Sequence, residues 1–201
     1  MRKNSQENPS LENLFEDFNH PNPNINYNSF LKMNEYWPEE SMEKLMNNLD
    51  NKDVFLRRKS VKALGVFGEK ILLPVSKLFC QSEDKIIRVS CLKVLIIASS
   101  NITLRTYPDE IIHVIKQALN EDSTEIILAV ISFLRQLGDF GIPFLKQACR
   151  DENILKSRAS VTAIGEIKEP SIEKFLIELV EDKSLDIIVR EAAESYLRAS
   201  L

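Results

Sequence analysis

One pattern recurs six times along the chain: a residue suited to capping a helix is followed by apolar or small residues at fixed offsets. The capping residues, whose side-chain oxygens can accept hydrogen bonds from the free N–H groups of a helix's first turn, are Asn22, Asp53, Asp84, Ser123, Asn153 and Asp186. The residues three past each cap are Ile25, Leu56, Ile87, Ile126, Lys156 and Val189. Seven past each cap stand the small residues Ser29, Ser60, Cys91, Val130, Ser160 and Ala193, and eleven past stand Met33, Leu64, Leu95, Leu134, Ile164 and Leu197. These offsets fall on one face of a helix.

The spacing of the caps restricts the fold further. Successive caps are 31, 31, 39, 30 and 33 residues apart. Self-similarity at this period is typical of helical repeat arrays, in which stacked helical pairs bury a shared core. The sequence therefore predicts an all-α protein, a right-handed α-solenoid of about six helical-pair repeats with about 11 or 12 helices and no sheet.

Prolines and glycines are expected to mark the ends of the helices. We expect the first helix of each later pair to be introduced by a proline, because proline is favoured in a helix's first turn; these prolines are Pro38, Pro74, Pro108, Pro143 and Pro170. The glycines stand mostly where second helices should end, where a positive φ angle is cheap; they are Gly65, Gly68, Gly138, Gly141 and Gly165. Extra sequence around residues 98–107 explains the longest interval and predicts a long second helix in the third repeat. This insertion is either a tolerated loop or a contact surface.

Composition limits the function and the location. Residues 1–10 carry no periodic apolar residues and are predicted to form a flexible N-terminal arm, followed by a single repeat domain over residues 11–201. With 26 basic and 30 acidic residues the chain has no overall positive field, which argues against a nucleic-acid partner. No stretch approaches the roughly 18 apolar residues of a membrane span, and the start lacks the apolar core of a secretory signal. We therefore expect a cytoplasmic protein without membrane insertion.

Three arginines occupy the same repeat position, four residues past an aspartate cap: Arg57, Arg88 and Arg190. They could form a row of guanidinium groups that binds a carboxylate or phosphate ligand. Alternatively, each could pair with its aspartate in a ladder that joins successive repeats. We favour the ladder, because the other repeats would interrupt a ligand track with Asn26, Ile127 and Ser157.

Two further groups of residues are candidates for binding. The densest basic cluster, opposed locally only by Asp53, consists of Lys52, Arg57, Arg58, Lys59 and Lys62. It could attract an acidic partner or the carboxylates of a ligand, although a solvated outer face is the more usual meaning of such a run. Tyr36 and Trp37 either line an apolar ligand groove or pack between the first two repeats.

Residues typical of catalysis are sparse. His20 and His113 each lack a second ligand at the i+4 spacing of a metal site, so no metal site is predicted. The three cysteines are widely spaced, which argues against a disulfide framework and a paired-cysteine zinc site. Cys91 is expected to be buried, and Cys80 and Cys149 more exposed, but no local cation cluster marks a nucleophile. The run Asp139-Phe140-Gly141 matches a kinase motif by chance, because the rest of the kinase signature is missing. Catalytic and cofactor-binding residues are left unassigned.

Several segments resemble, in order, the E/F-type phycobilin lyases. They are residues 14–15, 20–24, 49–54 and 57–66, and later 88–91, 107–108, 118–120, 163–167 and 189–193. The similarity covers roughly residues 11–200.

The resemblance implies HEAT-like repeats and a role in the covalent attachment of phycoerythrobilin to a cysteine of phycoerythrin subunits. The chemistry of that family is addition of the acceptor thiol to the ethylidene group of the bilin, which forms a thioether. The resemblance further implies a hetero-oligomer with a partner bilin lyase, in the cytosol of a photosynthetic prokaryote or the plastid stroma. Phycoerythrobilin would be at most a transient ligand, with no tightly bound cofactor.

Departures from the family's repeats favour a helper over a catalyst. Ile96 stands where a repeat glycine is expected, and Ile127 and Ser157 stand where repeat arginines are expected. These differences fit a chaperone-like, non-catalytic subunit, and the question whether the chain is an enzyme is left open.

Two other classes of function compete with this one, a scaffold and an enzyme on a similar solenoid. The main alternative is a HEAT-repeat scaffold for protein–protein interaction without pigment chemistry. An alkyl-base glycosylase on a similar solenoid is disfavoured by the slightly acidic composition, and a metal-dependent hydroxylase by the lack of paired His and Glu motifs.

Overall fold

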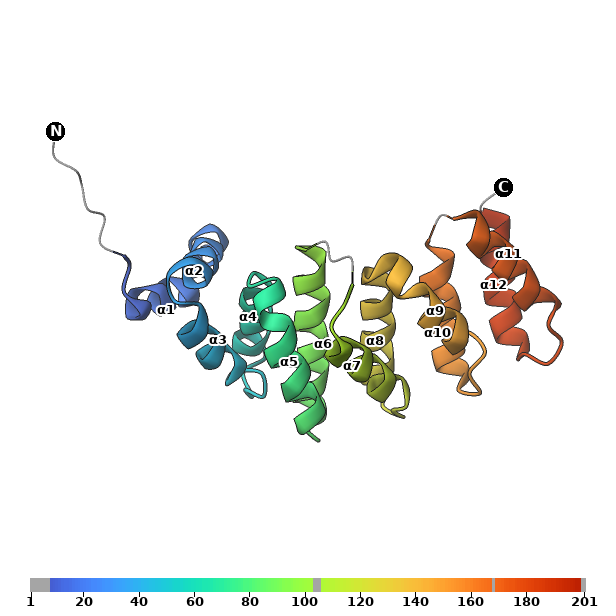
Figure 1. Cartoon of the computed structure of the whole chain (residues 1–201), viewed down its shortest axis with the longest axis horizontal. Helices are drawn as coiled ribbons and strands as arrows, with labels where there is room; N and C mark the ends of the chain where they lie inside the picture. Colours follow the sequence, from blue (N-terminus) through green and yellow to red (C-terminus); the bar gives the residue numbers. More distant parts are fainter. Residues whose placement is uncertain (1–7, 103–105, 168, 200–201) are drawn as a thin grey trace. The chain divides into compact units, whose positions relative to one another are not determined.

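The computed structural model describes residues 8–102, 106–167 and 169–199 (Figure 1). These residues form twelve α-helices and one 3₁₀ helix and contain no strand, which confirms the all-α prediction. The helices are α1 (Leu11–Asn19), α2 (Pro23–Tyr36), α3 (Pro38–Met46), α4 (Val54–Gly65), α5 (Glu69–Gln81), α6 (Lys85–Ser100), α7 (Asp109–Leu119), α8 (Thr124–Gln136), α9 (Ile142–Ala148), α10 (Ile154–Gly165), α11 (Pro170–Glu181) and α12 (Ile187–Ala199), with η1 (Gly138–Phe140) before α9.

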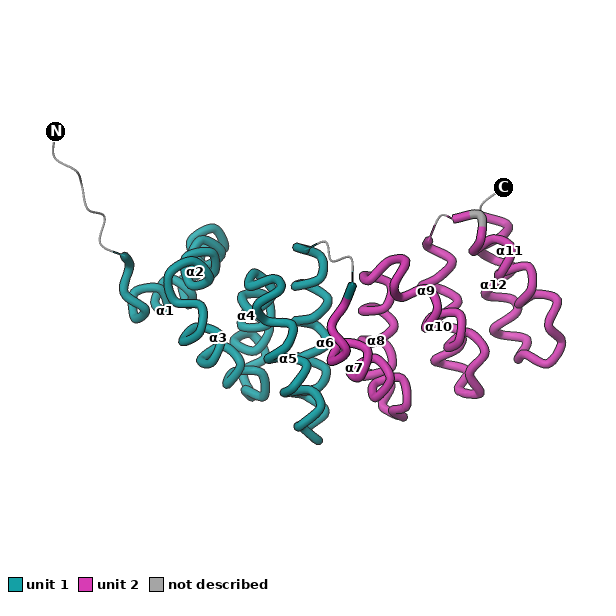
Figure 2. The backbone as a smooth tube through the Cα atoms, viewed as in Figure 1, with its two compact units in different colours: residues 1–106 teal, residues 107–201 magenta. Residues whose placement is uncertain are grey.

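Contacts divide the chain into two compact units, residues 1–106 with α1–α6 and residues 107–201 with α7–α12 (Figure 2). Within each unit a first helix packs against a second helix, as α5 does with α6 and α11 with α12. Second helices of successive repeats also pack on each other, as in α4 with α6 and α10 with α12. This stacking is that of an α-solenoid. The single domain predicted over residues 11–201 and the right-handed sense of the superhelix stay predictions.

The predicted N-terminal arm lies partly outside the described residues, which begin at residue 8. Its last two residues contact the first helices. The Ser10 hydroxyl accepts a hydrogen bond from the Asn13 N–H and caps α1, and the Pro9 carbonyl accepts one from Trp37 Nε1 at 2.8 Å.

All six predicted caps stand directly before a second helix, at the starts of α2, α4, α6, α8, α10 and α12. Five of them accept a hydrogen bond from a backbone N–H in the first turn, such as Asp53 from Phe55 at 2.8 Å and Asp186 from Ile188 at 2.8 Å. Ser123 is the exception, because its hydroxyl donates to the Glu125 carboxylate and makes no cap bond.

This difference gives a stability prediction with a built-in control. Replacing Asp53 by Ala should lower the free energy of unfolding by about 1 kcal/mol, because two N–H groups of α4 lose their acceptor. Ser123→Ala should cost only a small fraction of that value. Urea denaturation followed by circular dichroism measures both, and equal losses for the two variants would contradict the assignment of the caps.

The repeat positions seven and eleven past the caps form the core as predicted, whereas only three of the six residues three past a cap are buried, since Ile25, Leu56 and Ile87 are half-buried. All six residues seven past a cap are buried, with at most 1% of their surface exposed. Of the residues eleven past a cap, five are 0% exposed, and only Leu197 is half-buried. The one polar residue three past a cap, Lys156, is 8% exposed, and its ammonium pairs with the Asp151 carboxylate at 3.0 Å.

Four of the five prolines stand where predicted, and Pro74 does not. Pro38, Pro143 and Pro170 lie in the first turn of α3, α9 and α11, and Pro108 directly precedes α7. Pro74 lies inside α5, which begins at Glu69. The prediction failed because the buried stripe of α5 starts upstream, at Ile71, and tertiary burial outweighs a local cost of about 3 kcal/mol for proline within a helix.

Positive φ is found, as expected, at Gly68 after α4 and at Gly138 after α8, but two other glycines end second helices for a different reason. Gly65 and Gly165 are the last residues of α4 and α10, and neither has a positive φ. A Cβ at Gly65 would lie 2.3 Å from Ile97 Cγ2, and one at Gly165 would lie 2.5 Å from the Tyr196 ring. These two glycines therefore set how closely neighbouring second helices approach.

The long interval between the third and fourth caps is partly helical. α6 extends to Ser100 and, at 16 residues, is the longest described helix, as the sequence predicts. Residues 103–105 of the extra sequence lie outside the described residues.

Candidate binding grooves between second helices

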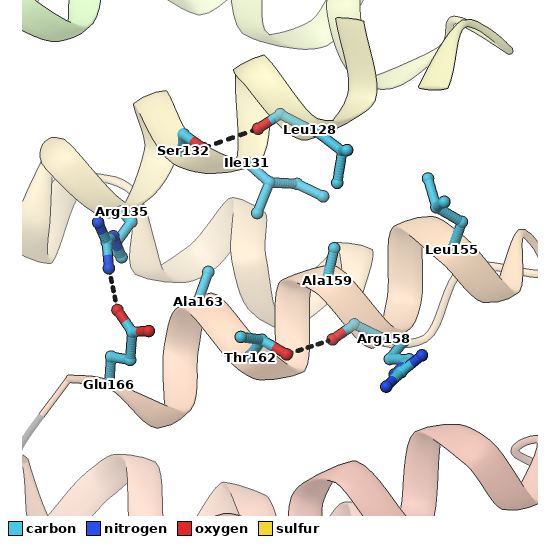
Figure 3. A pocket seen from close by; sticks show the side chains of 10 residues that line it. All are labelled: Leu128, Ile131, Ser132, Arg135, Leu155, Arg158, Ala159, Thr162, Ala163 and Glu166. Atoms are coloured by element: carbon cyan, nitrogen blue, oxygen red, sulfur yellow. Dashed lines mark hydrogen bonds and ion pairs between the residues drawn. The ribbon is translucent and has the colours of Figure 1, made fainter. Parts of the chain in front are cut away.

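Each unit contains a groove between two successive second helices. The α4–α6 groove has a volume of about 330 Å³, and its lining residues are Arg57, Arg58, Val61, Lys62, Ser90, Lys93, Ile96 and Ile97. The α8–α10 groove has a volume of about 600 Å³ (Figure 3), and its lining residues are Leu128, Ile131, Ser132, Arg135, Leu155, Arg158, Ala159, Thr162, Ala163 and Glu166. Both volumes lie within the range of small-molecule sites.

The two grooves occupy the same positions of the repeat. Counting from the caps, Lys62 of α4 corresponds to Ser132 of α8, since both stand nine residues past the cap. In the same way Lys93 of α6 corresponds to Thr162 of α10. The same arrangement of two second helices therefore presents lysines at these positions in one groove and hydroxyl side chains in the other.

The α4–α6 groove is cationic. Four of its eight lining residues are arginine or lysine, and none of the eight is a carboxylate. Arg58, Lys62 and Lys93 are exposed and form no ion pair with any residue that the structure describes, whereas Arg57 donates to the Asn51 carbonyl. Between the cations lie Val61, which is buried, and two half-buried isoleucines. This arrangement suits an anion with an apolar body.

The α8–α10 groove is less charged, and four of its polar side chains are already bonded; the Arg158 guanidinium is exposed and forms no ion pair with a described residue. Figure 3 shows Arg135 of α8 and Glu166 at the end of α10 pointing toward each other, where they form an ion pair. The Ser132 hydroxyl donates to the Leu128 carbonyl at 2.8 Å, and the Thr162 hydroxyl donates to the Arg158 carbonyl at 3.2 Å. This groove has no comparable set of uncompensated charges.

The predicted ladder of Asp–Arg pairs is wrong for two of its three rungs. Within the described parts of the chain, Asp53 and Arg57 are not an ion pair, and neither are Asp186 and Arg190, because both carboxylates cap the backbone instead. Arg88 is 7% exposed, and its guanidinium lies 4.4 Å from the centre of the Phe79 ring. Such a buried arginine is not part of an open ligand track.

Other residues form the ion pairs that link repeats. Arg135 pairs with Glu166, and Arg150 pairs with Asp182, with the partners 31 and 32 residues apart. Hydrogen bonds from Ser184, with a further contribution from Arg150, lower the pKa of the Asp182 carboxyl. Opposite charges one repeat period apart are the sequence signal that identifies such pairs.

The basic cluster of residues 52–62 is divided by the fold. Arg57, Arg58 and Lys62 line the α4–α6 groove, whereas the Lys59 ammonium lies 5.3 Å from the centre of the Phe18 ring. Lys93, which completes the groove, was not part of the predicted cluster. It stands 31 residues after Lys62, so aligning the repeats by their caps would have identified it.

Of the two aromatic candidates, Trp37 has a structural role, whereas Tyr36 is 37% exposed. Trp37 donates its Nε1–H to the Pro9 carbonyl, which favours packing over a ligand groove. Phe140, in the run that matches a kinase motif, lies with its ring centre 4.8 Å from that of Tyr107 and 6.0 Å from that of Phe144. His20 accepts a hydrogen bond from the Asn22 N–H through Nδ1 in the turn before α2.

All three cysteines are free thiols with raised pKa values. Cys91 is fully buried, as predicted, and Cys149 is also fully buried, which corrects the expectation that it would be more exposed. Desolvation raises the pKa of Cys91 and of Cys149 to about 12, and it also raises the pKa of Cys80. The thiols are therefore protonated at neutral pH and are poor nucleophiles.

The described residues offer neither a cluster of metal ligands nor a helix suited to a membrane. In that part of the chain no three or more His, Cys, Asp or Glu residues are grouped so that they could hold a metal ion. None of the described helices has the length and apolar character needed to cross a membrane.

Comparison with known proteins identifies similar chains. No family model matches the sequence. The bilin biosynthesis protein CpeZ of Synechococcus sp. (strain WH8020) is 26% identical over 174 residues, which cover 82% of this chain and 92% of CpeZ. The uncharacterized phycocyanin operon protein Z of Pseudanabaena tenuis (strain PCC 7409) is 26% identical over 192 residues, which cover 92% of this chain and 93% of that protein.

Comparison with solved structures supports the fold. The X-ray structure of Escherichia coli YibA, a HEAT-like repeat protein, matches with a TM-score of 0.53 and 16% identity, covering 98% of this chain and 76% of YibA. At this identity the match shows the fold alone, an α-solenoid of HEAT-like repeats. The resemblance carried by the repeats is thus confirmed: over most of its length, this chain is similar to the bilin biosynthesis protein CpeZ.

Proposed function

We propose that this protein assists the covalent attachment of phycoerythrobilin to a cysteine of phycoerythrin subunits, as a chaperone-like accessory subunit beside a partner bilin lyase. The observation that carries the proposal is the similarity to the bilin biosynthesis protein CpeZ across 92% of the length of CpeZ. The repeat segments that resemble the E/F-type lyases occur in the same order, which adds support.

The chemistry of the two grooves favours holding a pigment or protein over transforming it. A catalyst of thioether formation would need a positioned acid or base near the acceptor thiol. Among the described lining residues of both grooves there is no imidazole, and the one carboxylate, Glu166, is paired with Arg135. The chain's own thiols are protonated at neutral pH, so they would compete poorly with the acceptor cysteine for the bilin.

Co-expression tests the proposal. Phycoerythrin subunits and phycoerythrobilin are produced with a candidate partner lyase, with and without this protein, and attachment is scored as zinc-induced fluorescence of the phycoerythrin band on a gel. We expect little attachment by this protein alone and a higher yield when the lyase is present. An unrelated helical-repeat protein expressed at the same level is the control. Robust attachment without a lyase would make this protein a lyase in its own right.

A scaffold function without pigment chemistry is the second candidate, favoured by exposed apolar residues in the first turns of several second helices. Phe55 is 82% exposed and Ile86 is 47% exposed in the first unit, and Ile187 is 53% exposed in the second. Such residues suit a protein partner. An unchanged yield of chromophorylated phycoerythrin with every partner lyase would favour this candidate.

A further inference from the structure

We infer that the α4–α6 groove binds an open-chain tetrapyrrole through its propionate carboxylates, which pair with Arg58, Lys62 and Lys93. The inference rests on the proposed function, since that function makes a bilin the ligand. The groove itself specifies a small anion with an apolar body.

The first step of the argument is the uncompensated charge. Arg58 and Lys62 stand four residues apart on one face of α4, and Lys93 lines the same groove from α6. Like charges at this spacing destabilise a helix, and no carboxylate lines the groove to offset them. The chain as a whole has a net charge of −4, so this group of cations is opposite in sign to the overall charge.

The second step is that the fold does not require these cations. At the corresponding repeat positions the α8–α10 groove carries Leu128, Ser132 and Thr162. Two second helices thus also pack side by side with neutral residues at all three positions. A role in binding explains the charges, and a role in packing does not.

The third step is the apolar surface between the charges. Val61 is 6% exposed, and Ile96 and Ile97 are half-buried, so the conjugated rings of a bilin would contact aliphatic side chains while its propionates reach the cations. Phe55 and Ile86 stand seven residues before Lys62 and Lys93, on the same helical faces, and extend this surface.

The size of the groove favours a small molecule over a peptide. Its lining residues run from Arg57 to Lys62 in α4, about 9 Å of helix, and from Ser90 to Ile97 in α6, about 12 Å. Its volume of about 330 Å³ is at the lower end of small-molecule sites, and it is open to solvent, so a longer ligand can extend beyond it.

The test is a titration of the purified full chain with phycoerythrobilin, followed by absorbance. We expect saturable binding that weakens with rising salt, because exposed charges are screened. The double variant Lys62→Gln/Lys93→Gln should weaken binding about tenfold, since two charge-assisted contacts are lost. The dimethyl ester of the pigment, which lacks both carboxylates, should bind the native protein about as weakly as the free pigment binds the variant.

A matched control removes the same charge elsewhere. Lys77 of α5 and Lys174 of α11 are exposed lysines on first helices, and Lys77→Gln/Lys174→Gln should leave pigment affinity unchanged. All four substituted lysines are exposed, so both double variants should keep the native circular dichroism spectrum and melting temperature.

The outcomes separate this inference from the proposed function. Equal pigment affinity of the native protein and the groove variant would overturn the inference, and so would equal affinity for pigment and ester. Binding of an acidic peptide but not of pigment would also overturn it and make the groove a protein interface. In each case a raised phycoerythrin yield in co-expression would leave the proposed function standing.

Discussion

Replacing Leu95 by Ala should lower the free energy of unfolding by about 2–5 kcal/mol, among the largest effects expected of a single substitution in this chain. Leu95 is 0% exposed and stands eleven residues past the cap of α6, the helix that packs against both α4 and α5. Truncation leaves a cavity in the core that α6 shares with α4 and α5, and these helices can fill it only by shifting toward one another. Urea denaturation followed by far-UV circular dichroism measures the loss.

Leu197 provides the matched control, because it stands at the same repeat position in α12. It is half-buried, whereas Leu95 is fully buried, so Leu197→Ala should cost less than half as much. Equal losses would show that the repeat position and not its burial decides the effect, and a negligible loss for Leu95→Ala would contradict the packing of α6 in the first unit.

The core could be predicted from the sequence because it depends on local and periodic signals. A capping residue such as Asp84 satisfies N–H groups only two or three residues away. The buried positions seven and eleven past each cap follow from helical geometry alone. Summing these signals over six copies made the pattern stronger than any single copy would have been.

The grooves could not be predicted in the same way, because each is formed by residues one repeat apart. Lys62 belongs to a recognisable basic run, but Lys93 is the one charged residue between Arg88 and the end of α6. Only the side-by-side packing of α4 and α6 brings them to one groove. The Arg135–Glu166 pair was missed for the same reason.

Local rules also misled where tertiary contacts override them. The rule that proline starts a helix placed the start of α5 at Pro74, whereas the buried Ile71 extends the helix upstream. The rule that glycine allows positive φ explains Gly68, with φ 56°, but not Gly65. Gly65 is required because a Cβ there would clash with Ile97 of the neighbouring helix α6. The sequence around Gly65 does not show this contact.

Replacing Gly65 by Ala should therefore cost about 1–3 kcal/mol, the usual range for overpacking a well-packed contact. The new Cβ would lie 2.3 Å from Ile97 Cγ2 and 2.6 Å from Ile97 Cβ. Because the Ile97 Cβ is fixed to the backbone, rotation of the side chain cannot relieve the clash, and α4 and α6 would have to separate. Thermal unfolding followed by circular dichroism measures the cost.

Gly165→Ala is the control, since Gly165 ends α10 as Gly65 ends α4. Its added Cβ would lie 2.5 Å from Cγ of Tyr196, an atom that moves when the side chain rotates about χ1, whereas the Ile97 Cβ is fixed to the backbone. Alanine is also favoured over glycine within a helix by about 1 kcal/mol, which offsets part of the cost at both sites. Gly165→Ala should therefore cost less than Gly65→Ala.

The Gly65 substitution also connects packing to the inferred binding site. Ile97 lines the α4–α6 groove opposite Val61, so separating the two helices would widen the apolar surface on which the bilin rings are proposed to lie. We expect Gly65→Ala to weaken pigment binding at temperatures well below its melting transition, whereas Gly165→Ala should leave binding unchanged. Native stability and native pigment affinity in Gly65→Ala would together show that this contact does not set the width of the groove.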